Sequence, residues 1–191
     1  MSLQHREKLI SQIEEKQPAM GGLLSDRSGS LMRGSWDLKS WSFQLGFEAM
    51  WDLAKANHNG LLNGPMLSIW RQSIELTFKS CIRSIEEDPR KTVKLGHDLN
   101  KLFQRLLKLS RDAGLCHNDL DLKVEALINE VQSFDPYADR FRYPADRKDT
   151  LYEGVGVDLD KVFQAHFLIV GWCEGTVAEL VAEFGIGPDP R

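Results

Sequence analysis

The stretch that decides the fold of this chain is residues 65–85, with the sequence PMLSIWRQSIELTFKSCIRSI. Pro65 suits the first turn of a helix, because the backbone N–H that proline lacks would have no partner there. The apolar residues then recur three and four positions apart, which places on one helical face Leu67, Trp70, Ile74, Phe78, Cys81 and Ile85. Asp88 and Pro89 interrupt this pattern, so the stretch predicts an amphipathic helix packed against a core.

The same spacing recurs in four other parts of the chain. It predicts helices from Trp36 to Asn57, from Asp98 to about Asp112, from Leu120 to Val131, and from Asp158 to Gly185. Asp98 and Asp158 precede their stretches as expected N-caps, and Gly114 is the expected end of one helix. No strand-forming alternation extends beyond a few residues. We therefore expect an all-α fold of about five to six helices, with a long ordered loop over 134–157 before the last helix.

The chain of 191 residues suits one main domain. The apolar residues before Pro18 predict a short first helix, and the glycine- and serine-rich residues that follow predict a mobile loop. We expect residues 1–34 to form this helix and flexible loop, residues 35–184 to form the helical bundle, and residues 185–191 to form a tail.

Composition limits the classes of function that the chain can serve. A charged fraction of 27% and a net charge of −4 fit a soluble globular protein without general attraction to nucleic acids. The three cysteines form no Cys-x-x-Cys pair, and no secretory signal or membrane-spanning run is visible, so we expect a cytoplasmic protein that binds no membrane. No metal and no cofactor is expected, because zinc-ligand spacings and phosphate-binding glycine loops are absent from the sequence.

Two pairs of polar residues are candidates for a site on the helices. Glu75 and Lys79 lie four residues apart, which suits either an exposed helical ion pair or a polar site at the edge of the apolar face. His97 and Asp98 lie at a helix start, where Asp98 can cap the helix or the helix end can hold an anion. Both interpretations stay open for each pair.

The long loop supplies a third group of candidates. Arg140 and Arg142 alternate with Phe141 and Tyr143, a pattern that could stack bases and pair with phosphates. Alternatively, the rings anchor the loop on the core while Arg142 reaches a helix carboxylate such as Glu75.

The final helix carries two further features. His166 lies within its apolar face, which is typical of a buried core histidine. Gly171 and Gly175 suggest a close crossing with another helix, either of this chain or of a second subunit. The tryptophans of the helix that begins at Trp36 are expected core or dimer contacts.

Three segments together resemble a known family. They are Ser73-Ile74-Glu75-Leu76-x-x-Lys79, Gly96-His97-Asp98-Leu99-x-x-Leu102-Phe103 and Phe141-Arg142-Tyr143-Pro144 before a long final helix. In this order they resemble the HEPN family, the nucleotide-binding helical domains of prokaryotes and higher eukaryotes. The resemblance spans roughly residues 36–184 and implies an up-and-down helical bundle that commonly forms homodimers. It also implies a role among ribonuclease toxins, defence systems, RNA-processing modules, nucleotide binders or their non-catalytic partners.

The active ribonucleases of that family carry an arginine, a polar residue after it, and a histidine a few positions further, near the start of the final helix. In this chain Arg111 and His117 have that spacing, but they lie at the end of an internal helix. His166 lies in the final helix without an arginine at the required distance.

Our leading hypothesis is a HEPN-like binding or regulatory module for RNA, a nucleotide or a partner protein, without nuclease chemistry. Its polar cluster would join Glu75, Lys79, His97, Asp98 and Arg142, with Arg140 and Tyr143 nearby. One alternative is a metal-independent endoribonuclease that uses Arg111 and His117 across a dimer interface. Another is a structural assembly subunit.

Overall fold

The computed structural model describes residues 35–86, 88, 90–116, 118–154 and 156–185, and also Gln4, Glu7, Lys8, Ser11, Gln12 and Glu15. The chain divides into two compact units, Met1–Arg33 and Gly34–Arg191. The six described residues of the first unit are all helical and exposed. The loop expected over residues 18–34 lies outside the described residues, as do most positions of the expected first helix.

The second unit consists of helices α2 (Trp36–Ala56), α3 (Asn63–Ile85), α4 (Arg90–Val93), α5 (Leu99–Ala113), α6 (Asp119–Phe134) and α7 (Leu159–Phe184). Its described residues form no strand beyond one isolated antiparallel bridge between Ala145 and Leu151. The expected all-α bundle is thus confirmed. Only α4 was not indicated by the sequence, because four residues are too few to show a helical period. None of the described helices is both long and apolar enough to cross a membrane.

Local signals set the ends of several helices. Asp98 and Asp158 cap α5 and α7, and each carboxylate accepts a hydrogen bond of 3.1 Å from the backbone N–H three residues further on. Gly114 and Gly185 follow the same two helices in the left-handed conformation, with φ of 113° and 64°. Glycine adopts this conformation without the steric cost of a side chain. The predicted caps are therefore confirmed.

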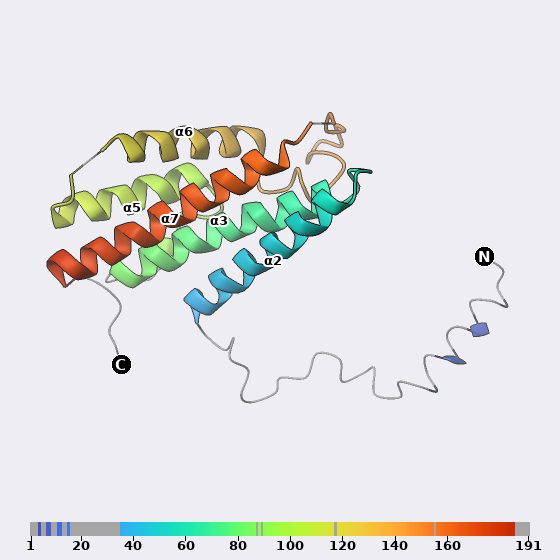
Figure 1. Cartoon of the computed structure of the whole chain (residues 1–191), viewed down its shortest axis with the longest axis horizontal. Coiled ribbons are helices and arrows are strands. Elements are labelled where there is room, and N and C mark those ends of the chain that lie inside the picture. The colour runs from blue at the N-terminus through green and yellow to red at the C-terminus, as the bar shows by residue number, and fades with distance from the viewer. Residues whose placement is uncertain are drawn as a thin grey trace. The chain divides into compact units, whose positions relative to one another are not determined.

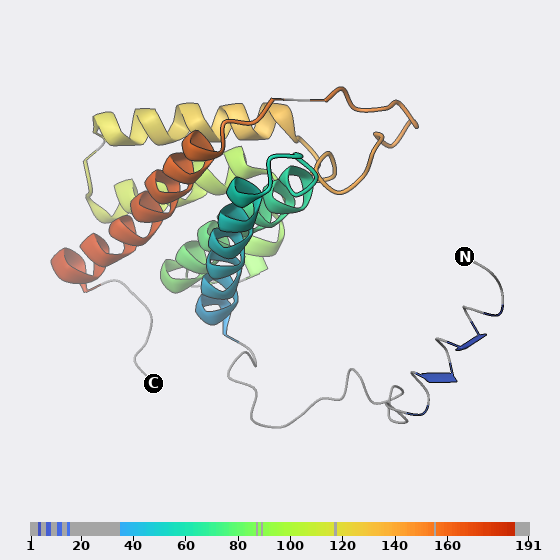
Figure 2. The same ribbon diagram turned by 45° about the vertical axis from the view of Figure 1, so that its right-hand side comes forward.

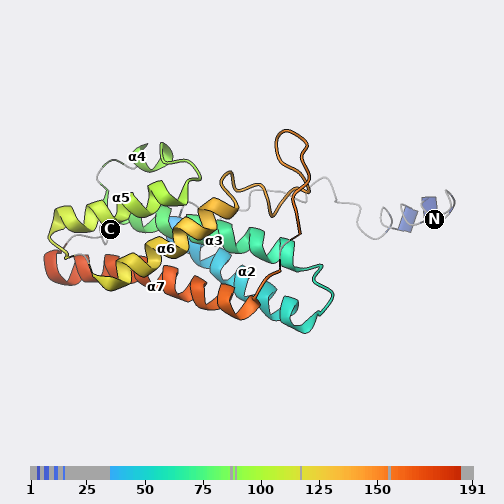
Figure 3. The same ribbon diagram turned by 90° about the horizontal axis from the view of Figure 1, so that it is seen from above.

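Helix α3 lies at the centre of the bundle and contacts α2, α5 and α7 (Figure 1). The turned view shows α2 packed along α3, with α6 on the far side of the molecule from α2 (Figure 2). The short α4 lies at the edge of the bundle (Figure 3). The largest fully buried side chains come from α2, α3, α5, α6 and α7, and include Phe47, Phe78, Phe103, Met66, Ile128 and Ile169.

The connection between α3 and α5 brings the chain back along the bundle. Helices α3 and α5 run in the same direction, because residues further along α3 contact residues further along α5. The three contacts that show this are Arg71 with His97, Phe78 with Phe103, and Glu86 with Arg105. The pairs α2–α3, α5–α6 and α6–α7 run antiparallel (Figure 1). The described part of the connection, which includes α4, therefore crosses over, and this crossover places the start of α5 beside the middle of α3.

Candidate functional site

A network of charged side chains is centred on Glu75, in the middle of α3. Its carboxylate accepts a hydrogen bond from Lys79 Nζ at 2.7 Å and from Arg71 Nη1 at 3.4 Å. His97 Nδ1 lies 2.9 Å from Oε1 and 3.1 Å from Oε2. A carboxylate can only accept, so His97 Nδ1 donates the hydrogen bond to an ionised Glu75. Glu75 is only 1% exposed, so these partners replace the water that the carboxylate has lost.

The positions of these residues follow from local structure. Arg71, Glu75 and Lys79 are each four residues apart, so they lie above one another on α3. His97 comes from the turn before α5, which Gly96 enters with a positive φ of 63°. Asp98 then caps α5. The turn and the cap together hold the histidine ring against the carboxylate of α3.

Arg71 extends the network to two other segments. Its Nη2 donates to the backbone carbonyl of His97 at 2.5 Å and to Gln132 Oε1 at 3.4 Å. Gln132 Oε1 also accepts from the Leu99 backbone N–H at 2.8 Å, and its Nε2 donates to the Pro136 carbonyl at 2.9 Å. The network therefore ties α3 to the start of α5 and the end of α6.

The guanidinium of Arg71 is buried, with 2% of the residue exposed. Burial lowers the pKa of Arg71, the carboxylates of Glu75, Asp135 and Asp98 oppose that shift, and the charge of Arg142 lowers the pKa further. Arginine still keeps its proton in a protein. Its Nε–H finds no acceptor in the described part of the chain. A buried donor without a partner costs about 1–3 kcal/mol, so this N–H group lowers the stability of the site.

A hollow of about 250 Å³ lies beside Arg71, between α2, α3 and the loop after α6. Its lining contains two guanidinium groups, from Arg71 and Arg142, and one carboxylate, from Asp135. One oxygen of Asp135 accepts the backbone N–H groups of Asp139 and Arg140, at 2.9 and 3.1 Å. Positive charge therefore exceeds negative charge in the lining. The remaining lining residues are Phe43, Ser68, Ile69, Gln72, Ala138 and Phe141.

The basic residues of the loop have separate roles. Arg140 lies over the rings of Phe134 and Tyr152, with 4.1 and 5.1 Å between its guanidinium carbon and the ring centroids. Arg142 donates a hydrogen bond to the backbone carbonyl of Ala138. Tyr143 is 60% exposed. Of these residues, only Arg142 lines the hollow beside Arg71.

The structure brings together three residues that the sequence singled out, namely Glu75, Lys79 and His97. Arg142 bonds within its own loop, and the arginine that reaches Glu75 is Arg71. The spacing of four residues before Glu75 was the signal that could have identified Arg71. Gln132 carried no such signal, because its partners lie far away in the sequence.

The residues of the ribonuclease hypothesis lie elsewhere. Arg111 is exposed and lines a separate hollow of about 210 Å³ between the end of α5, the start of α6 and α7. Its expected partner His117 lies outside the described residues. Gly171 and Gly175 line the same hollow, and a Cβ on either would meet no heavy atom within 4 Å. These glycines therefore form no close helix crossing within the described chain, in contrast to that part of the expectation.

His166 is a core residue, as its place on the apolar face of α7 indicated. It is 1% exposed, and its ring centroid lies 4.4 Å from that of Phe47. Burial lowers the pKa of His166 to about 4. Its Nδ1 has no hydrogen-bond partner in the described part of the chain. The ring is therefore neutral at pH 7 and packs as an aromatic side chain.

No group of three or more histidine, cysteine, aspartate or glutamate side chains suited to a metal ion occurs among the residues that the structure describes. No protein-family model, curated protein or solved structure matches this chain. An inference about function therefore rests on the geometry of the Glu75 network and of the hollow beside it.

Proposed function

We propose that this chain is a HEPN-like helical module that binds RNA or a nucleotide through a phosphate group, without cleaving it. One observation carries the proposal: Arg71, buried and with its Nε–H unpaired, lines the same hollow as Arg142. The hollow beside Arg71 is the proposed binding site.

The charges of the hollow favour an anion. Arg71 and Arg142 are close enough for each charge to act on the other, although the carboxylates of Glu75, Asp135 and Asp98 favour the charge of Arg71. A negative group in the hollow would add a counter-charge beside both guanidinium groups. Planar guanidinium groups bind phosphate oxygens through paired hydrogen bonds. A phosphate in the hollow would give both guanidinium groups a common negative partner.

The apolar part of the lining favours a ligand with a flat ring. Phe43 and Phe141 both line the hollow. Aromatic side chains beside a cationic groove stack bases without requiring a particular sequence. At about 250 Å³ the hollow lies below the usual range of about 300–1,000 Å³ for complete small ligands. It therefore suits one part of a nucleotide or one position along an RNA strand.

The Glu75 network fits a supporting role in binding. Lys79 and His97 both hold the Glu75 carboxylate, and that carboxylate holds Arg71. Through these contacts the network fixes the guanidinium of Arg71 at the wall of the hollow. A charged group that is held in place before binding loses less entropy when the ligand arrives.

The test is a fluorescence-anisotropy titration of a labelled single-stranded RNA, with unlabelled ATP and AMP as competitors. Arg142→Ala should weaken binding about tenfold and reduce the slope of affinity against salt concentration by about one. Arg90→Ala is the matched control, because Arg90 is 88% exposed in its side chain and follows the far end of α3. Equal binding by the R142A and R90A variants, or no saturable binding, would contradict the proposal.

A second measurement separates binding from cleavage. The same RNA is incubated with the protein in EDTA, alongside the Arg111→Ala, His117→Ala and His97→Ala variants. We expect intact RNA in every sample. Cleavage that the R111A and H117A variants both lose would replace our proposal with the ribonuclease hypothesis.

A further inference from the structure

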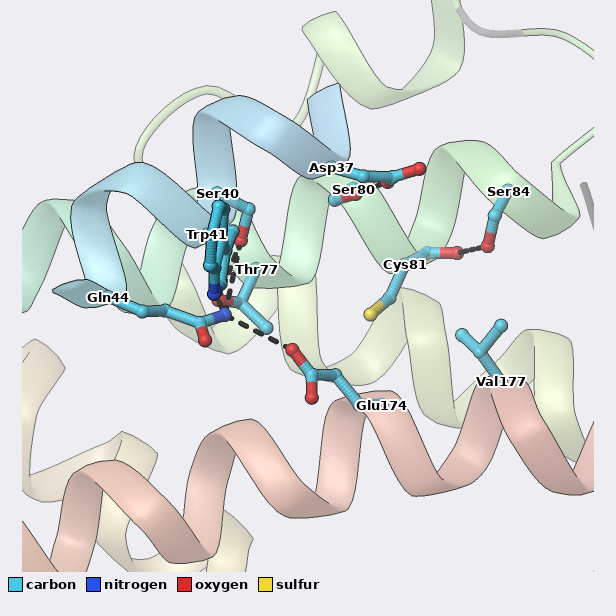
Figure 4. A pocket seen from close by; sticks show the side chains of 10 residues that line it. All are labelled: Asp37, Ser40, Trp41, Gln44, Thr77, Ser80, Cys81, Ser84, Glu174 and Val177. Carbon is cyan, nitrogen blue, oxygen red and sulfur yellow. Dashed lines mark hydrogen bonds between the residues drawn. The ribbon is translucent and has the colours of Figure 1, made fainter. Parts of the chain in front are cut away.

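A second hollow lies on the other side of α3, between α2, α3 and α7, and the proposed function does not use it (Figure 4). Its volume is about 240 Å³. Four hydroxyl groups, one amide, two carboxylates and one thiol line it, together with two apolar side chains. These residues are Asp37, Ser40, Trp41, Gln44, Thr77, Ser80, Cys81, Ser84, Glu174 and Val177.

The hydroxyl groups on the α2 side of this hollow already donate their hydrogens to acceptors within the chain. Thr77 Oγ1 donates to the Ser73 carbonyl at 3.0 Å, so Ser40 donates to Thr77 Oγ1 across 3.0 Å. Gln44 Nε2 lies 3.2 Å from Thr77 Oγ1 and 3.1 Å from Glu174 Oε1, and it donates to both (Figure 4). These contacts leave lone pairs, and no hydroxyl hydrogen, for a ligand.

The two remaining hydroxyl groups also donate their hydrogens within the chain. Ser80 Oγ donates to Asp37 Oδ1, and Ser84 Oγ donates to the Cys81 carbonyl at 2.8 Å. The lining thus offers acceptors to an incoming molecule, and it carries two negative charges and no basic side chain. A ligand that donates hydrogen bonds and carries positive charge complements these acceptors and carboxylates, and the indole N–H of Trp41 adds a donor at the rim.

The thiol of Cys81 lies at the inner wall of the hollow, where Cys81 belongs to the hydrophobic core. Cys81 is 8% exposed, its sulfur points into the hollow in Figure 4, and it makes no hydrogen bond in the described part of the chain. Burial, with the charges of Glu174 and then Asp37, raises the pKa of this thiol to about 12. Both carboxylates therefore act on the same buried atom, although they come from different helices.

We propose that this hollow binds an alkylguanidinium or alkylammonium group, held by the carboxylates of Asp37 and Glu174. Trp41 lies at the rim and is 57% exposed, so its ring is available to contact the cation. The small volume suits a single basic side chain or a small amine. The same chemistry can come from a free small molecule or from an arginine or lysine of a partner protein.

The test uses two-dimensional proton–nitrogen NMR spectra of the full chain titrated with ethylguanidinium, with ethylammonium, and with ethylurea as a neutral control of similar shape. We expect saturable shifts of the Trp41 indole N–H and the Gln44 side-chain amide with at least one cation, and none with ethylurea. Equal shifts with ethylurea, or no saturable shift with either cation, would overturn the proposal.

Matched variants locate the binding. Glu174→Gln and Asp37→Asn remove one charge each and keep the side-chain shape, and each should weaken cation binding about tenfold. Glu183→Gln removes an exposed charge from the same helix, α7, outside the hollow, and should leave binding unchanged. If E174Q and D37N both behave like E183Q while the spectra show a folded protein, the proposed site is wrong.

A blocked tripeptide, acetyl-Gly-Arg-Gly-amide, separates the two sources of the cation. Binding at least as tight as that of ethylguanidinium supports a partner side chain as the natural occupant. Weaker binding supports a small free molecule. The RNA titration proposed above does not involve this hollow, so either proposal can fail without the other.

Discussion

Helix α3 carries two polar faces whose side chains find different kinds of partner. One face presents the charges of Arg71, Glu75 and Lys79, and the opposite face presents the hydroxyl groups of Thr77 and Ser80. Two residues along a helix correspond to a rotation of about 200°, so Glu75 and Thr77 point to nearly opposite sides. The charged face bonds to the turn before α5 and to α6, whereas the hydroxyl face bonds to α2.

The difference shows how a buried polar group determines which segments must meet. Glu75 needs a positively charged or N–H partner on several sides, and those partners come from its own helix and from a turn 22 residues away. A buried hydroxyl needs only one acceptor, which Thr77 finds in the carbonyl one helical turn before it. We therefore expect the two faces to respond differently when one group is removed.

Replacing Glu75 by Gln should cause a severe loss of stability. The E75Q variant keeps the shape of the side chain but leaves Arg71 and Lys79 without their common counter-charge. Removing one partner of a buried ion pair typically costs about 3–5 kcal/mol. Urea unfolding followed by circular dichroism measures this loss.

Glu183→Gln serves as the control for E75Q, because Glu183 is exposed on α7. Its effect should stay within about 0.5 kcal/mol. If E75Q loses less than about 1 kcal/mol, the negative charge of Glu75 is not needed to compensate the charges of Arg71 and Lys79.

His166 allows a test of a buried titratable group that contacts no charged side chain among the described residues. Since its pKa is about 4 in the folded chain and 6.5 is the ordinary value, the unfolded chain binds the extra proton between these pH values. Stability should therefore fall as the pH drops from about 6.5 to about 4, and the contribution should level off below that. The expected loss between pH 7 and pH 4.5 is about 2–3 kcal/mol.

The variant His166→Gln isolates this contribution. Carboxylates titrate in the same pH range, but they do so in the wild type and in the variant alike. The difference between the two urea-unfolding free energies should therefore shrink or reverse in favour of H166Q at pH 4.5. A constant difference across this pH range would mean that the folded chain accepts the proton on His166 without cost.

The sequence predicted the helices of the second unit well, because the signals for them are local. The apolar period of residues 65–85 corresponds to α3, and the expected caps at Asp98 and Asp158 occupy those positions. The four-residue α4 gave no such signal. The parallel arrangement of α3 and α5 was also not visible, because it depends on how the crossover packs.

The site was predicted only in part. Glu75, Lys79 and His97 meet, and the order of the three short motifs drew attention to them. The role of Arg71 depends on where the turn before α5 lies, which no local pattern encodes. Trp41, expected as a core or dimer contact, lies 57% exposed at the rim of the hollow between α2, α3 and α7. Exposure depends on the neighbouring helix, so the residue type alone could not decide it.

Replacing Thr77 by Val probes the hydroxyl face and should have a smaller effect than E75Q. The T77V variant removes the oxygen that accepts from Ser40 at 3.0 Å and from Gln44 at 3.2 Å, at an expected cost of about 1 kcal/mol. The double variant S40A/T77V removes both hydroxyl partners, so it should lose less than the two single variants added together. Urea unfolding measures the stability of S40A, of T77V and of the double variant. Simple additivity would show that the two hydroxyls act independently, and a T77V loss as large as that of E75Q would mean that charge does not distinguish the two faces of α3.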